Sequence, residues 1–112
     1  MANRVIPSAY FEKRYKKFVK KFPSLNDELE ELEILLLANP KTGNDLGSGL
    51  FKIRLANKSK GTGKSGGFRV ISYLINKTET GTDIFLITIY DKSEESSIDK
   101  NVLKKLVKEL FG

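Results

Sequence analysis

Basic residues gather in one stretch of the chain that contains no acidic residue. Within residues 46–78 they are Lys52, Arg54, Lys58, Lys60, Lys64, Arg69 and Lys77. The whole protein has 20 Lys and Arg against 14 Asp and Glu, so the net charge of +6 comes from this stretch and the remainder is nearly balanced. Clustered cations attract a polyanion, because several of them reach its phosphates together. The stretch therefore predicts a nucleic-acid-binding surface.

The composition also restricts the chemistry. The chain has no Cys and no His, which excludes disulfides, thiolate and imidazole catalysis and nearly all zinc sites. Any catalysis must use Lys, Arg, Tyr, Asp or Glu. Gly63-Lys64-Ser65 invites comparison with a nucleotide-binding phosphate loop, but Lys58 stands where that motif needs its first glycine, and a strand is expected to follow instead of a helix. We expect neither a nucleotide cofactor nor a metal ion.

Length and hydropathy indicate the class of protein. A chain of 112 residues has room for one domain, residues 1–112, and 39% hydrophobic residues are typical of a folded protein. The N-terminal sequence MANRVIPSAYFEKR lacks an apolar segment of signal-peptide length, and no apolar run approaches the roughly 18 residues that cross a bilayer. We expect a soluble cytoplasmic protein without membrane contact.

Two N-terminal segments have the helical period. After Ser8, a suitable helix N-cap, apolar residues recur at helical spacing as far as Phe22, and lysines occupy the opposite face. That lysine face is either a second nucleic-acid contact or an ordinary solvated surface. The pattern breaks at Pro23, and a second amphipathic helix should end at Asn39, because Pro40 disfavours helical geometry in the residue before it. The two segments predict a helical hairpin.

The period then changes to that of a strand. In residues 51–55 the apolar side chains share one face, while Lys52 and Arg54 share the other, about 7 Å apart. Further elements are expected at residues 68–75 (strand, with Arg69), 83–90 (strand) and after Asp99 (helix). The order predicts an α+β fold, in which an N-terminal helical hairpin packs on a small antiparallel β-sheet with a C-terminal helix, all helices backing one face of the sheet.

Several motifs occur in a fairly specific joint order. They are Asn39-Pro40, Gly47-Ser48-Gly49, Lys52-Ile53-Arg54, Gly66-Gly67-Phe68-Arg69-Val70 and Ile89-Tyr90-Asp91-Lys92. In this order the chain resembles the RelE/HigB group of bacterial toxins, within the RelE/ParE superfamily, from the first helix to the last. These are toxins of type II toxin-antitoxin pairs, and their RelE-like fold agrees with the elements expected above.

The resemblance implies a ribosome-dependent endoribonuclease, or mRNA interferase, that inhibits translation. Cleavage follows attack of a 2′-hydroxyl on the adjacent phosphate and needs no metal. This reaction requires a base, cations for the phosphorane and an acid for the 5′-oxygen. Without His, a Lys beside other cations is the available base and Arg the available charge clamp. Lys52, Arg54 and Arg69 match the basic positions of the family.

Other roles in this site are less well defined by the sequence. Where RelE toxins carry an arginine after the third strand this chain has Lys92, and the position of their late catalytic tyrosine falls on Ile98. Either Tyr90 or Lys92 is the candidate general acid, or Tyr90 only packs at the sheet edge. Contacts to phosphate or ribosomal RNA are expected from Lys58, Lys60 and Lys64.

Two further functions remain open at this point. One is a ParE-like inhibitor that binds DNA gyrase without cutting nucleic acid, and the other is an RNA-binding module without catalysis. The cation cluster favours cleavage, because a gyrase binder needs no group that stabilises a phosphorane. The resemblance also implies partners, namely the ribosome with its mRNA and a cognate antitoxin encoded next door, often of helix-turn-helix type.

Overall fold

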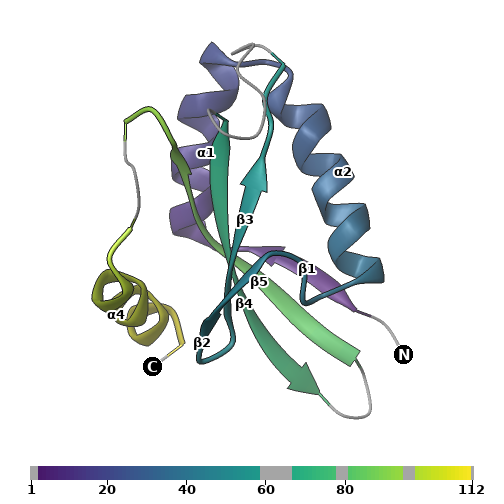
Figure 1. Cartoon of the computed structure of the whole chain (residues 1–112), viewed down its shortest axis with the longest axis vertical. Coiled ribbons are helices and arrows are strands. Elements are labelled where there is room, and N and C mark those ends of the chain that lie inside the picture. Colours follow the sequence, from purple (N-terminus) through teal and green to yellow (C-terminus); the bar gives the residue numbers. More distant parts are fainter. Residues whose placement is uncertain (1–2, 59–66, 78–80, 95–97, 112) are drawn as a thin grey trace.

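The computed structural model describes residues 3–58, 67–77, 81–94 and 98–111, and its arrangement is shown in Figure 1. The predictions for Lys60 and Lys64 lie outside these residues. The helices are α1 (Ala9–Lys21), α2 (Leu25–Ala38) and α4 (Lys100–Phe111). The strands are β1 (Arg4–Pro7), β2 (Asn44–Gly47), β3 (Leu50–Leu55), β4 (Phe68–Lys77) and β5 (Gly81–Asp91). The expected hairpin, sheet and C-terminal helix are thus all observed.

The sheet is larger than the predicted meander. It has five strands in the order β1-β5-β4-β3-β2, and β1 pairs with β5 in parallel while all other pairs are antiparallel. The sequence did not indicate β1 or β2, since both span only four residues and the second, NDLG, lacks β-branched side chains. Pairing of β1 joins Arg4 to Asp83, and the two side chains form a bidentate ion pair with both N–O distances at 3.0 Å.

The helical hairpin begins and ends close to the predicted residues. Ser8 caps α1, because its hydroxyl accepts a hydrogen bond from Phe11 N at 3.1 Å. At α2 the cap residue Ser24 makes no capping hydrogen bond through its side chain. The chain leaves α2 at Asn39, before Pro40, as expected. Both helices bury their apolar stripes on the same face of the sheet, against residues such as Ile53 and Phe68.

The position of the C-terminal helix corrects the prediction that all helices back one face. A second core, on the opposite face, joins Leu103 of α4 to Leu50, Ile71, Ile87 and Tyr90. In Figure 1, α4 accordingly lies apart from the α1–α2 pair. Strands β4 and β5 are apolar on both faces, and such strands need cover on both sides. The one-face prediction was wrong because the pattern of α4 shows that it has a buried stripe but not which face of the sheet receives it.

Candidate functional site

Three candidate residues stand in one cross-strand row. Arg54 of β3 pairs with Arg69 of β4, which pairs in turn with Tyr90 of β5. Directly paired residues project from the same face, here the face that carries α4 farther along the strands. Their exposure differs, since Arg54 is exposed whereas Arg69 and Tyr90 are 4% and 1% exposed. The Arg69 guanidinium is held by a 3.1 Å hydrogen bond from Nη1 to the Phe68 carbonyl.

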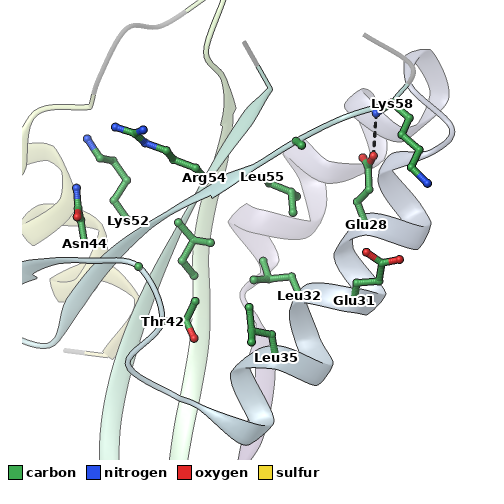
Figure 2. Close-up of a pocket in the computed structure, with 13 residues that line it drawn as sticks. Glu28, Glu31, Leu32, Leu35, Thr42, Asn44, Lys52, Arg54, Leu55 and Lys58 are labelled. Carbon is green, nitrogen blue, oxygen red and sulfur yellow. Dashed lines mark hydrogen bonds between the residues drawn. The ribbon is translucent and has the colours of Figure 1, made fainter. Parts of the chain in front are cut away.

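Lys52 lies two residues before Arg54 on the same face, as the alternation predicted. Its side chain is partly exposed, and its backbone pairs with Ile71 of β4 and Asn44 of β2. In Figure 2 the side chains of Lys52 and Arg54 both extend away from α2. The structure therefore brings Lys52, Arg54 and Arg69 together on one surface of the sheet, with an ammonium and a guanidinium accessible from solvent.

Lys92 belongs to the turn that follows β5. Its backbone N–H donates to the Gly67 carbonyl at 3.1 Å, which ties this turn to the start of β4 beside Arg69. The buried carboxylate of Asp91 fixes the turn, because it accepts hydrogen bonds from both Ser93 N (2.9 Å) and Ser93 Oγ (2.8 Å). The sequence analysis missed this pair, although Asp-x-Ser after a strand is the signal of such a turn.

Lys58 lies elsewhere. It follows β3, its backbone N–H donates to Glu28 Oε2 at 2.8 Å, and Glu28 Oε1 accepts from Asn57 Nδ2 at 2.6 Å. Figure 2 shows its side chain on the α2 side of β3, apart from Lys52 and Arg54. The structure does not bring Lys58 into the cluster of the three candidate cations.

A groove of about 780 Å³ separates α2 from β3. Leu32 and Leu35 of α2 line one wall with Glu28 and Glu31, and the other wall is β3 from Lys52 to Leu55 (Figure 2). Glycine is required at its lower end, because Gly43 has a φ of +103° and a Cβ there would lie 2.6 Å from the Lys52 carbonyl oxygen. Sequence reasoning did not predict this groove, since it depends on the distance between two packed elements.

The basic outer face of α1 lies at the end of β5. Arg14 Nε donates to the Ile89 carbonyl at 2.7 Å, and a pocket of about 370 Å³ is lined by this arginine, Lys17, Lys21 and Glu94 among others. Cations from α1 thus stand near the turn that carries Lys92. Whether this face contacts nucleic acid stays a prediction.

A helical hairpin and a C-terminal helix on opposite faces of a five-stranded mixed sheet, with cations on the face of α4, define a RelE-like fold. Residues 8–111 match the family model described as the RelE toxin of the RelE/RelB toxin-antitoxin system. The chain belongs to this toxin family. A toxin of such a system has a cognate antitoxin as its partner.

A solved structure supports the same fold. The free state of E. coli toxin RelE, in a mutant form, superposes with a TM-score of 0.61 at 18% sequence identity, covering 99% of this chain and 100% of that chain. In the part of the chain that the structure describes, no helix is both long and apolar enough to cross a membrane.

Proposed function

We propose that this toxin is a ribosome-dependent endoribonuclease that cuts mRNA by transphosphorylation at Lys52, Arg54 and Arg69. The observation that carries the proposal is the gathering of these three cations on one face of the sheet. A scissile phosphate gains negative charge in its transition state, and fixed cations that face this charge stabilise it. Membership of the RelE toxin family supports the assignment.

Each group has one role in this reaction. Lys52 accepts the proton of the ribose 2′-hydroxyl, and the resulting oxygen attacks phosphorus. The guanidinium of Arg54, exposed beside Lys52, binds the non-bridging oxygens, and buried Arg69 adds positive potential from below. The P–O5′ bond then breaks, which leaves a 2′,3′-cyclic phosphate on one fragment and a 5′-hydroxyl on the other.

We assign the proton donor to Lys92 in preference to Tyr90. A general acid must reach the leaving oxygen within hydrogen-bond distance. Tyr90 is 1% exposed and packs in the second core with Leu103, whereas Lys92 is partly exposed in a turn tied to the start of β4. The burial of Tyr90 supports its alternative role as a packing residue.

A cleavage assay with defined components tests this function. Purified toxin is added to ribosomes that translate a defined mRNA, and new 5′ ends are mapped by primer extension; the same mRNA without ribosomes is run beside it. Lys52→Ala removes the proposed base, and Lys105→Ala serves as a control because it removes an exposed lysine of α4 outside the cluster.

The expected result is cleavage only with ribosomes, absent for Lys52→Ala and unchanged for Lys105→Ala. Intact mRNA in every lane would refute the proposed nuclease, and inhibition of gyrase supercoiling would then be measured. Cleavage that persists in Lys52→Ala would place the chemistry elsewhere in the molecule.

A further inference from the structure

The turn that carries Lys92 is closed by hydrogen bonds on three sides of this residue. Asp91 Oδ1, just before it, accepts hydrogen bonds from Ser93 N at 2.9 Å and from Ser93 Oγ at 2.8 Å. Across the turn, Glu94 N donates to the Asp91 carbonyl at 3.1 Å. The N–H of Lys92 itself donates to the Gly67 carbonyl at 3.1 Å. The backbone of Lys92 is therefore held in place although the residue lies beyond the end of β5.

The carboxylate of Asp91 is built into the fold behind this turn. It is 3% exposed, and a carboxylate at such a depth needs hydrogen bonds to offset the loss of water. Asp91 pairs with Phe68, whose ring packs against Phe18 of α1, whereas Tyr90 pairs with Arg69. Because paired residues share a face and neighbours alternate, the carboxylate lies on the face opposite to Arg69. It holds the turn without placing a negative charge among the candidate cations.

Gly67 connects the same turn to the strand of Arg54. A Cβ at residue 67 would clash with the Leu55 carbonyl oxygen and would lie 3.1 Å from Ala56 Cα, so glycine permits this close approach of two chain segments. Leu55 directly follows Arg54 in β3. The carbonyl of Gly67 also accepts the hydrogen bond from Lys92 N. One residue thus contacts both the turn of Lys92 and the end of β3, and it fixes the distance between their backbones.

A lysine needs this kind of support if it is to donate a proton to one defined atom. Its four-carbon side chain is flexible, and a general acid must reach the leaving oxygen within hydrogen-bond distance. A misplacement of about 1 Å can lower a rate by about 10²-fold. The hydrogen bonds of the turn fix the point from which the Lys92 side chain starts, and so restrict the region that its ammonium group reaches.

We propose that Ser93 and Asp91 are positioning residues for Lys92, and that their side-chain hydrogen bond directs the lysine toward the 5′-oxygen of the scissile bond. This inference rests on the proposed nuclease function, in which Lys92 is the proton donor. In that step the P–O5′ bond breaks and its electron pair passes to O5′. A proton moves from the Lys92 ammonium to the same oxygen, which leaves a neutral amine and a 5′-hydroxyl. Ser93 and Asp91 do not contact the RNA and act through Lys92.

A sulfur substitution in the substrate separates this role from a general effect on the fold. A short synthetic mRNA is programmed on ribosomes with the 5′-oxygen at the mapped cleavage position replaced by sulfur. A thiol has a pKa of about 8.5, so the P–S5′ bond breaks to a thiolate that needs no proton donor. A defect in the general acid, or in its position, should therefore slow cleavage of the oxygen-linked mRNA and not of the sulfur-linked mRNA.

Two neighbouring exposed residues of the turn provide matched variants. Ser93→Ala removes the hydroxyl that donates to Asp91, and Ser93→Thr restores a hydroxyl at the same position. Glu94→Gln changes the next side chain, whose carboxylate is not one of the groups that close the turn. Lys92→Ala removes the proposed proton donor itself. Substitutions at exposed positions should fold, and circular dichroism and co-sedimentation with ribosomes check this for each variant.

We expect Ser93→Ala to lower the single-turnover rate on oxygen-linked mRNA at least about fivefold, and Lys92→Ala to lower it at least about 100-fold. On sulfur-linked mRNA both variants should cut at a rate within about twofold of wild type. Ser93→Thr and Glu94→Gln should match the wild type on both substrates.

An unchanged rate of Ser93→Ala on oxygen-linked mRNA would overturn the proposal. Equal losses of this variant on both linkages would also overturn it, because they would indicate a general disturbance of the site. If Lys92→Ala stays slow on sulfur-linked mRNA, Lys92 is not the proton donor and the positioning role is lost with it. Wild-type toxin that cuts neither substrate would instead refute the nuclease function on which the inference rests, so the two failures are distinguished.

Discussion

Arg54 and Arg69 face each other directly across β3 and β4, and like charges in this position destabilise a sheet. Arg54→Thr removes one charge and introduces a β-branched residue suited to a strand. We predict that it raises the free energy of unfolding by about 0.2–1 kcal/mol while it abolishes mRNA cleavage. Urea denaturation and the ribosome assay measure the two effects.

The control for this substitution is Lys105→Thr, which removes an exposed cation of α4 outside the cluster. It should leave cleavage nearly intact. A loss of stability in Arg54→Thr would show that the arginine pair is structural and not a site kept for an anion.

Glu33 of α2 gives a pH-dependent prediction. Burial raises the pKa of its carboxyl, and the neighbouring Glu30 raises it further. A folded-state pKa above the unfolded value means that the folded protein binds more protons, so this group adds stability as the pH falls through that pKa and removes it as the pH rises. Glu33→Gln should therefore stabilise the protein at pH 7 by up to about 0.5 kcal/mol, the usual range for a surface position.

The measurement is thermal unfolding of both proteins between pH 3 and pH 8. The difference in Tm should shrink at the acidic end, where the carboxyl of Glu33 is protonated in both states. A difference that grows on acidification would contradict the sign of this prediction.

At the residue scale, the sequence located the cations but not their mutual positions. Period-2 alternation placed Lys52 and Arg54 on one face, as observed. The pairing of Arg69 with Arg54 depends on the register between β3 and β4, which no pattern within either strand specifies. The burial of Tyr90 follows from the position of α4, which the sequence analysis assigned to the wrong face.

At the element scale, the turn before β2 supports the strand of the candidate site. Gly43→Ala introduces a Cβ that meets the Lys52 carbonyl oxygen. The positive φ of this position is also one that alanine disfavours. We predict that it destabilises the protein by about 1–3 kcal/mol and lowers cleavage, because β3 must move. Denaturant unfolding and the cleavage assay report both effects.

Gly47→Ala is the comparison. Its φ is +85°, but a Cβ there meets only Lys100 Nζ at 3.5 Å, so it carries strain without a backbone clash. It should cost less stability than Gly43→Ala and leave cleavage unchanged. Equal losses in both variants would mean that backbone strain alone accounts for the effect.

The long elements were predictable and the short ones were not. Helices α1 and α2 and strands β3 to β5 have apolar periods strong enough to place them within a few residues of their observed bounds. Strand β1 is defined by its pairing with Ile84 and the neighbouring residues of β5, about 80 residues later in the chain, so its own four residues do not reveal it. The groove between α2 and β3 likewise arises from packing, which sequence periodicity does not report.

At the scale of the whole molecule, two cores enclose the sheet and the second depends on α4. Leu103 is the buried residue of this helix and is 1% exposed. The ring of Phe111, at the end of the helix, lies 4.6 Å from the Phe85 ring and 5.3 Å from the Tyr73 ring, centroid to centroid. We predict that Leu103→Ala lowers the free energy of unfolding by about 2–5 kcal/mol, because it leaves a cavity beside Tyr90. Chemical denaturation measures the loss.

Val102→Ala is the matched control, since the preceding side chain is 47% exposed. It should change stability by no more than about 0.5 kcal/mol. Similar values for the two variants would contradict the packing of α4 on the second face.

The two helices of the N-terminal hairpin carry charges of opposite sign. Basic residues crowd the outer face of α1, whereas α2 carries acidic residues and no basic one. An ion pair joins Arg4 to Asp83, outside this hairpin. An RNA contact proposed for this toxin therefore belongs to the basic surfaces of α1 or of the sheet and not to α2, whose carboxylates repel phosphate.

The most direct test of the account separates binding from cutting. Lys52→Ala and Arg54→Ala toxins are each assayed for co-sedimentation with programmed ribosomes and for the single-turnover rate of mRNA cleavage. If these residues act in the chemical step, ribosome binding should stay within about twofold of wild type, while the cleavage rate falls at least about 100-fold. Parallel losses of binding and cleavage would show that the cations only hold RNA, and would contradict a catalytic site on this face of the sheet.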